Sequence, residues 1–397
     1  MIDGLEKLNL DAKSKSRLRK ILDAFLVGEL YGLHTLHSIL DALQITSRNL
    51  YKLWDAYTHR QIKELTTQLC IASFKEALGE LAKKSESSWS RAEVTVVIDD
   101  SIFKQWLKNM PRGAEYAKFF SGQVHKSVYG FRVSLVGVAI GKNFYPLYFE
   151  IVPKGKCTKK TALDLLKKVH QLFIQVAEKE RVSYPNLFLS VDSGFTDEDL
   201  IAYCKEHHIG FIGVPKRNNV FKIGRYKMNL KKYIEKIFEK KEKVHQQKYE
   251  AQAKTPPPFL MRKKVYFQAL NREVILVFFR LNGSGKVTVI FSLNFNTTAK
   301  TLRRRFFQRT KIELFFRFLK DTLKIQTSPS RNLESFEKKL SLFILKALVC
   351  KAFEKFCHQH YTRLRKYPFT RLRRHIIYQG VDKSPLESLF KKGAFAN

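Results

Sequence analysis

The chain has 397 residues, 44% of them hydrophobic, and is therefore long enough for two or three domains with a substantial core. It carries 73 Lys and Arg against 36 Asp and Glu, and this formal charge of +37 favours a polyanionic partner, with nucleic acid as the default. No run of 18 apolar residues and no apolar signal core is present, which argues against a membrane protein and predicts a soluble, cytoplasmic one.

The first part of the chain, residues 1 to about 90, is predicted to be all-helical. Residues 35–43 and 47–54 form two short helical patterns around a brief break, which is the shape of a helix-turn-helix motif that contacts DNA. A plain helical hairpin packed on the core is the alternative, and the sequence leaves both open. A long helix at 61–84 leads into a polar linker at 84–90, the first predicted boundary.

A short β-branched run at 94–98 predicts a strand that is buried on both faces. It ends in Asp99 and Asp100, and the carboxyl ends of strands are where open α/β sheets place their ligands. Because neighbouring residues of a strand point to opposite faces, only one of the two carboxylates can enter a site.

A hairpin is predicted next, with strands at 128–139 and 143–152 joined around residues 141–143. A long amphipathic helix at 159–180 follows, and Thr158 is predicted to cap it. Another buried strand at 187–191 ends in Asp192, for which a simple turn-capping role is the alternative.

Residues 219–297 are predicted to form a mainly β insertion. A charged helix at 230–244 opens it, and three strand-like runs follow at 264–270, 273–280 and 286–293.

The stretch 303–323 is predicted to be one helix, and it places Glu313 on a narrow face among basic residues. Four residues share or border this face: Phe306, Arg309, Arg317 and Lys320. An acid within a basic cradle suits a metal site that faces an anionic polymer. Ordinary ion pairing between residues four apart is the alternative. Farther on, a helix at 333–356 is expected to pack on the core, and the basic, aromatic-rich segment 363–375 indicates a nucleic-acid surface or a solvated tail.

The pattern Phe306-x2-Arg309-x3-Glu313-x6-Lys320 resembles the Tyr-x2-Arg-x3-Glu-x6-Lys signature of cut-and-paste transposases of bacterial insertion sequences. These are DDE enzymes with a ribonuclease H-like core. The spacing matches at every position, and the departure is Phe306 where the family has Tyr.

The resemblance extends to two acids upstream. The first catalytic Asp of the family often stands in an Asp-x-Ser/Thr pattern, which selects Asp99 over Asp100. Asp192, which is followed by Ser-Gly-Phe, a helix and a strand, resembles the second catalytic Asp.

The implied fold is α/β, a ribonuclease H-like mixed sheet flanked by helices. The implied segments are a helical DNA-binding region (1–90), a first core part (91–218), the mainly β insertion (219–297), a second core part (298–350) and a basic helical C-terminal region (351–397).

The resemblance further implies that Asp99, Asp192 and Glu313 hold two Mg²⁺ ions, for which Mn²⁺ can substitute, and catalyse cleavage and strand transfer on DNA. The residues expected to contact DNA are Phe306, Arg309, Arg317 and Lys320. The implied partners are the inverted repeats at the element ends, target DNA and a second copy of the chain, in a nucleoid-associated homodimer. A nuclease without strand transfer and a DNA-binding descendant of such an enzyme are the alternatives.

Overall fold

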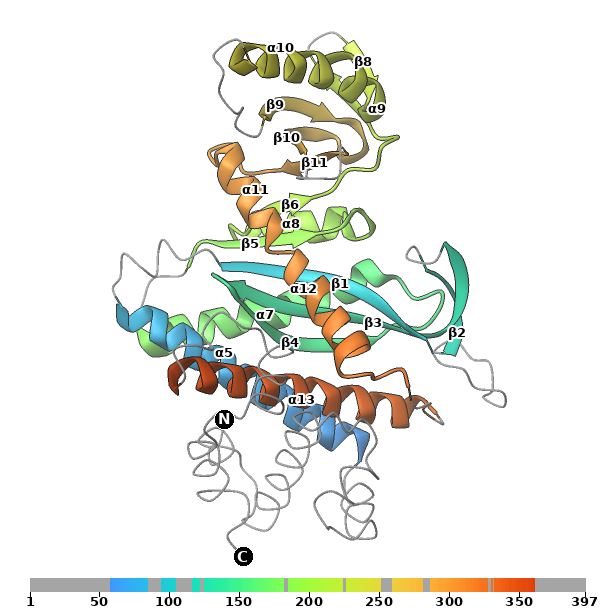
Figure 1. Ribbon diagram of the computed structural model, residues 1–397, viewed down its shortest axis with the longest axis vertical. Coiled ribbons are helices and arrows are strands. Elements are labelled where there is room, and N and C mark those ends of the chain that lie inside the picture. Colours follow the sequence, from blue (N-terminus) through green and yellow to red (C-terminus); the bar gives the residue numbers. More distant parts are fainter. Residues whose placement is uncertain are drawn as a thin grey trace, which may run out of the picture. The chain divides into compact units, whose positions relative to one another are not determined.

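A computed structural model describes most of the chain between residues 58 and 360 (Figure 1). The described residues are 58–84, 94–104, 116–121, 125–181, 185–223, 226–250, 259–280, 286–327, 330 and 332–360. The predicted helix-turn-helix, the polar linker after residue 84 and the basic segment 363–375 lie outside these ranges. The described residues fall into two compact units: the second unit takes residues 78–100 and 134–313, and the first unit takes the rest.

A mixed sheet forms the centre of the second unit, with the strand order β3-β1-β5-β6-β11-β10-β9-β7-β8 and with β4 also paired to β3. Its strands are β1 (Val94–Lys104), β3 (Lys126–Ile140), β4 (Asn143–Ile151), β5 (Leu187–Val191), β6 (Gly210–Gly213), β7 (Val220–Ile223), β8 (Tyr226–Asn229), β9 (Leu260–Phe267), β10 (Arg272–Arg280) and β11 (Val287–Ser292). The last residues of β1 and the first half of β3 belong to the first unit. Strands β1, β5 and β6 run parallel, whereas β11, β10 and β9 pair antiparallel. The predicted α/β class with a mixed sheet is confirmed.

The parallel pair β1 and β5 is the most deeply buried part of this sheet. Residues 94–98 and all of β5 are buried, as expected for strands covered on both faces. Their register pairs Val94 with Leu187 and Ile98 with Val191. The two strands therefore run side by side over five residues, and β5 ends at Val191 while β1 continues to Lys104.

Two helices of the second unit, α7 (Thr158–Glu180) and α8 (Glu198–Glu206), pack on each other, and α7 also packs on β4. The prediction that Thr158 caps α7 is wrong. The helix begins one residue earlier, and its cap is Cys157, because the carbonyl of Cys157 already accepts the amide of Thr161. The side chain of Cys157 makes no capping bond.

The predicted insertion has both strands and helices. Strands β10 and β11 agree with the predicted runs, but the run predicted at 264–270 is wrong in its limits: β9 begins at Leu260 and ends at Phe267, and residues Gln268–Leu270 form a 3-10 turn. Strand β11 also pairs with β6, so the three strands extend the central sheet. The predicted helix at 230–244 continues to Glu250 as α9 (Leu230–Tyr233), a π-helical turn and α10 (Glu239–Glu250). Arg280 Nε of β10 lies 2.8 Å from the carboxylate of buried Glu242, which fastens α10 to the sheet.

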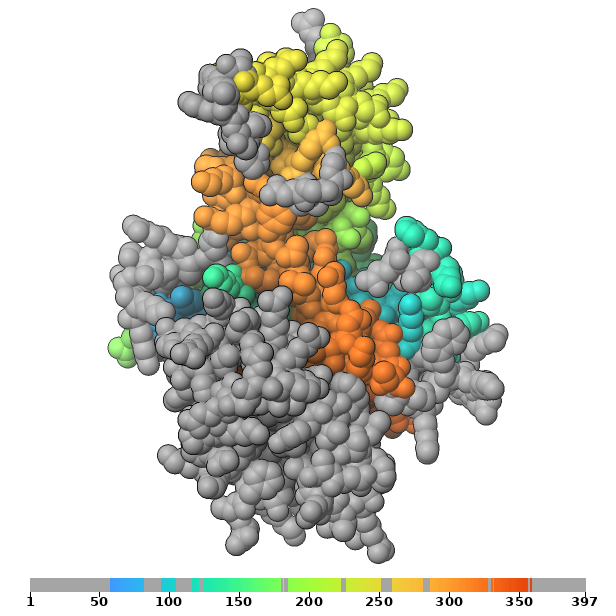
Figure 2. Space-filling model, in the orientation of Figure 1, coloured from blue at the N-terminus to red at the C-terminus, as the bar shows by residue number. Residues whose placement is uncertain are grey.

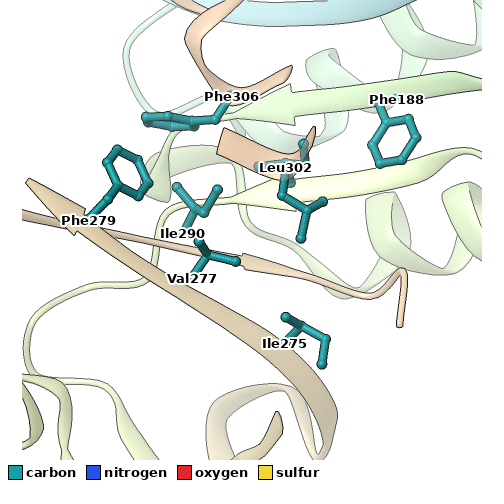
Figure 3. Packing of buried hydrophobic residues seen from close by; sticks show 8 residues of the cluster. Phe188, Ile275, Val277, Phe279, Ile290, Leu302 and Phe306 are labelled. Atoms are coloured by element: carbon teal, nitrogen blue, oxygen red, sulfur yellow. The ribbon is translucent and has the colours of Figure 1, made fainter. Parts of the chain in front are cut away.

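The hydrophobic centre of this region lies between the sheet and α11 (Ala299–Phe307) (Figure 3). Side chains from β5, β6, β10 and β11 pack there against two residues of α11: Phe188, Ile212, Ile275, Val277, Phe279, Ile290, Leu302 and Phe306. Helix α11 is thus held both by the core strands β5 and β6 and by strands β10 and β11 of the insertion.

In the first unit, α5 (His59–Lys84) lies against α13 (Leu333–His360). Lys63 Nζ and Glu337 Oε1 are 2.8 Å apart, and Thr66 donates to the carbonyl of Ser341. Strand β2 (Tyr116–Ser121), which was not predicted, pairs antiparallel with β3. Within the described residues, no helix combines the length and the apolar character that crossing a membrane requires.

Candidate active site at the ends of β1 and β5

The segment that carries Glu313 is not the single helix that the sequence predicts. Helix α11 ends at Phe307, α12 covers Thr310–Arg317, and residues Phe318–Thr322 form a π-helical turn. This segment reaches the surface on the face shown in Figure 2, where it is orange.

The interruption has a local cause. The amides of Arg309 and Ile312 donate to carbonyls only three residues back, so the backbone tightens between the two helices. The Thr310 hydroxyl donates to the carbonyl of Phe307 at 2.8 Å and satisfies an acceptor at the end of α11. The residues before Arg309 therefore do not share one regular helical face with Glu313.

Asp99 and Asp192 follow the last paired residues of two neighbouring parallel strands, Asp99 within β1 and Asp192 directly after β5. Ile98 and Val191 are register partners, and each is directly followed by an aspartate, Asp99 and Asp192 respectively. Each aspartate accepts the backbone amide of its successor through Oδ1, at 2.9 Å for Asp99 and 2.7 Å for Asp192. Adjacent strands lie about 4.8 Å apart, so residues in matched register place their side chains on the same face and close together.

Arg309 connects this strand end to α12. Its Nη2 lies 2.6 Å from Glu313 Oε1, and its Nη1 lies 3.6 Å from Asp99 Oδ2. The side chains of Asp99 and Arg309 are only 15% and 17% exposed, and that of Glu313 is 38% exposed. One guanidinium group therefore spans two of the three predicted catalytic acids.

The electrostatics single out Asp99. Burial raises the pKa of the Asp99 carboxyl to about 7, Arg309 opposes this shift, and the negative charges of Asp100 and Asp192 add to it. A buried carboxylate beside two other carboxylates gains most from a cation nearby. In the described part of the chain, however, no three His, Cys, Asp or Glu side chains are grouped closely enough to hold a metal ion.

A family model described as a transposase DDE domain matches residues 95–348, which is more than half of the chain. The chain belongs to the DDE transposase family. The family supports a transposase function and implies an enzyme of the nuclease and transposase class. No curated protein matches the chain.

Phe306, where the predicted signature has Tyr, packs inside the transposase. It is 8% exposed in the hydrophobic cluster of α11, and its ring meets those of Phe279 and Phe307 at centroid distances of 6.1 and 6.0 Å. The guanidinium carbon of Arg309 lies 5.8 Å from its ring centroid. The contacts of Phe306 therefore indicate a packing role.

Lys320 and Arg317 belong to the first unit. Lys320 Nζ donates to Ser101 Oγ at 2.6 Å and lies 5.0 Å from the centroid of the Phe103 ring. Ser101 is the third residue of the Asp-x-Ser pattern. Its hydrogen bond with Lys320 is a contact that the pattern alone does not indicate. Arg317 is exposed.

Two basic residues that position α11 and α12 were missed. Arg305 is 5% exposed, and its Nη1 donates to the carbonyls of Val94 at 3.1 Å and Asn186 at 3.3 Å. Lys311 Nζ donates to the carbonyls of Gly141 and Asn143, and burial lowers the pKa of its amine to about 8. Both have basic neighbours in the sequence, as solvated residues often do. The adjacent apolar residues are the one sequence signal that they are at least partly buried.

Proposed function

We propose that this transposase binds the terminal inverted repeats of its own element and performs metal-dependent DNA strand cleavage and strand transfer. In this proposal it is of the Tyr-Arg-Glu-Lys type and belongs to a bacterial insertion sequence. The observation that carries the proposal is the matched placement of Asp99 and Asp192, with Glu313 linked to Asp99 through Arg309. Asp100, as the next residue of β1, points to the other face of the strand, which favours Asp99 as the first acid.

The strand order supports a ribonuclease H-like core for the proposed enzyme. The chain order is β1 with the first acid, the extra strand β2, the hairpin β3–β4, the helix α7 and the parallel strand β5, which the second acid directly follows. The third acid comes on a helix after the last core strand. This order supports the proposal that Asp99, Asp192 and Glu313 are the three catalytic acids.

The donor set fits divalent metal. Asp99, Asp192 and Glu313 would hold Mg²⁺, a hard cation that prefers carboxylate oxygens, once Glu313 is released from Arg309. Bound Mg²⁺ would supply activation of the attacking oxygen and stabilisation of the leaving oxygen in phosphodiester chemistry. The chain itself orients Asp99 and Asp192 through the backbone amides of Asp100 and Ser193.

The charge of the chain supports a DNA substrate. With +37 overall, the protein can neutralise many phosphates. Arg309, Arg317 and Lys320 are proposed to contact the DNA backbone near the cleaved bond. Paired element ends would bring two copies of the chain together as a homodimer before target DNA is joined.

The experiment that tests the proposal uses the purified full chain and linear DNA that includes the sequences flanking its gene. With Mg²⁺, the wild type is expected to cleave at the element ends. Asp192→Asn and Glu313→Gln should lose cleavage yet retain DNA binding in a gel-shift assay, and Asp199→Asn, an exposed acid on α8, is the matched control. Wild-type cleavage by Asp192→Asn or Glu313→Gln would refute the assignment.

Two further measurements refine the proposal. Asp99→Asn and Asp100→Asn are compared singly, and a loss confined to Asp99→Asn is expected. The products are then incubated with a supercoiled target plasmid, and joined molecules are expected. Cleavage without any joining would identify a nuclease that lacks strand transfer, and binding without cleavage would identify a DNA-binding descendant.

A further inference from the structure

Arg309 lies where a metal ion would have to compete with it. Its guanidinium group bridges Asp99 Oδ2 and Glu313 Oε1, at 3.6 and 2.6 Å, and most of its surface is buried. These are two of the three carboxylates that the proposed function assigns to metal, and the inference rests on that function.

A guanidinium and a divalent cation cannot both satisfy the same carboxylates at full strength. Each is attracted to the same oxygens, and they repel each other where water is scarce. The present geometry favours the guanidinium, because Glu313 is turned toward Arg309 and the described acids form no group of three that could hold a metal. Metal binding therefore requires Arg309 to withdraw from at least one carboxylate.

The remaining contacts of Arg309 leave it able to move. Its Nε is buried without a hydrogen-bond partner among the described residues, and its only ring neighbour there, Phe306, lies 5.8 Å away. By contrast, the neighbouring cation Lys311 is bound to the carbonyls of the β3–β4 turn. Of these two cations, Arg309 is thus the one that pairs with both Asp99 and Glu313.

We propose that Arg309 is the resident cation of the metal-free site and competes with the divalent ion for Asp99 and Glu313. The guanidinium keeps the acids neutralised before metal enters, and it thereby weakens metal binding. When it withdraws, it is released toward the surface, where a DNA phosphate is a suitable acceptor.

Mg²⁺ affinity measured by isothermal titration calorimetry on the full chain, at pH 8.5 and without DNA, tests this competition. Arg309→Gln should bind Mg²⁺ about 5- to 150-fold more tightly than the wild type, the range typical of coupled sites. Arg304→Gln is the matched control, because it removes the same charge from an exposed position on α11, outside the residues proposed to bind metal or DNA. Its Mg²⁺ affinity should equal that of the wild type.

Thermal unfolding gives a second readout that does not depend on activity. In EDTA, Arg309→Gln should unfold at a lower temperature than the wild type, because Asp99 and Glu313 lose their counterion. Saturating Mg²⁺ should raise its unfolding temperature more than it raises that of the wild type. Arg309→Lys keeps one charge without the two-pronged bridge, so it should fold even where Arg309→Gln does not and should bind Mg²⁺ with intermediate affinity.

The possible results separate the inference from the proposed function. Equal or weaker Mg²⁺ binding by Arg309→Gln and Arg309→Lys overturns the competition, while Mg²⁺ binding that is lost in Asp192→Asn still supports the metal site. An absence of Mg²⁺ binding in every variant, the wild type included, overturns both. Tighter binding in Arg304→Gln as well would show a general charge effect and would also overturn the specific role of Arg309.

Discussion

Replacing Arg305 by Met should loosen the attachment of α11 to the sheet. Arg305 donates to the carbonyl of Val94, the first residue of β1, and to that of Asn186, just before β5. Its guanidinium carbon also lies 3.9 Å from the centroid of the Phe188 ring. Met fills much of the same volume, but it cannot donate to either carbonyl.

The expected loss can be worked out from these contacts. Each carbonyl left without its partner costs about 1–3 kcal/mol, and the loss of the cation–π contact adds to this. Removing a buried charge gives part of this back, because the guanidinium no longer has to be desolvated. The free energy of unfolding of the second unit should therefore fall by about 2–4 kcal/mol.

Hydrogen exchange followed by mass spectrometry measures this effect locally. Amides of β1, β5 and α11 that exchange through opening of the second unit should exchange about 30- to 1,000-fold faster in Arg305→Met, the equivalent of that free energy. Arg304→Met is the matched control, since Arg304 is the exposed neighbour on α11. Equal exchange in the two variants would refute the reasoning, because Arg305 would then contribute no more than a surface arginine.

Three further predictions concern the site and its surroundings. Burial raises the pKa of Asp99 to about 7 from an ordinary value of 3.8, so the folded state holds this proton more tightly than the unfolded state. The stability of the metal-free wild type should therefore fall as pH rises from about 4 to about 7, by up to about 4 kcal/mol, and level off above 7; urea titrations of Asp99→Asn should lack this fall. Phe306→Tyr should lower the urea midpoint because a hydroxyl enters an apolar cluster, whereas unchanged stability with faster cleavage would place the ring against DNA instead. DNA affinity should fall steeply with salt, and a slope of log K against log salt equivalent to only one or two ions would contradict a phosphate-binding role for the basic surface.

The elements that could be predicted are those with a strong local pattern. The apolar run of β5 is bounded by polar residues, and its predicted limits are those observed. Strand β1 continues to Lys104, beyond its predicted end. The prediction stopped early because the polar residues that begin at Asp99 interrupt the apolar run. Strand β2 has no clear alternation of its own, and its pairing with β3 holds it in place.

The sequence indicated the acids of the candidate site and Arg309, whose pairing with Glu313 four residues away was the alternative and is observed, but it did not indicate the buried Arg305. A carboxylate after a buried strand is visible in the sequence, and so is an acid among basic residues. The tight turn before Thr310 is not, because the apolar and basic pattern runs without interruption through it. Which arginine of the run Arg303–Arg305 becomes buried depends on how α11 is rotated against the sheet, and that is a property of the tertiary packing.

The anchoring of α11 from two sides bears on how this protein can change in length. Asp192 and Glu313 are 121 positions apart (313 − 192), yet that number does not set their separation in space. Arg305 fastens α11 to the starts of β1 and β5, and β10 covers its apolar face. Strands β10 and β11 thus belong to the framework that holds α11 just before Glu313, whereas the stretch from β7 to α10 is a module whose loops can lengthen or shorten without changing how α11 is held.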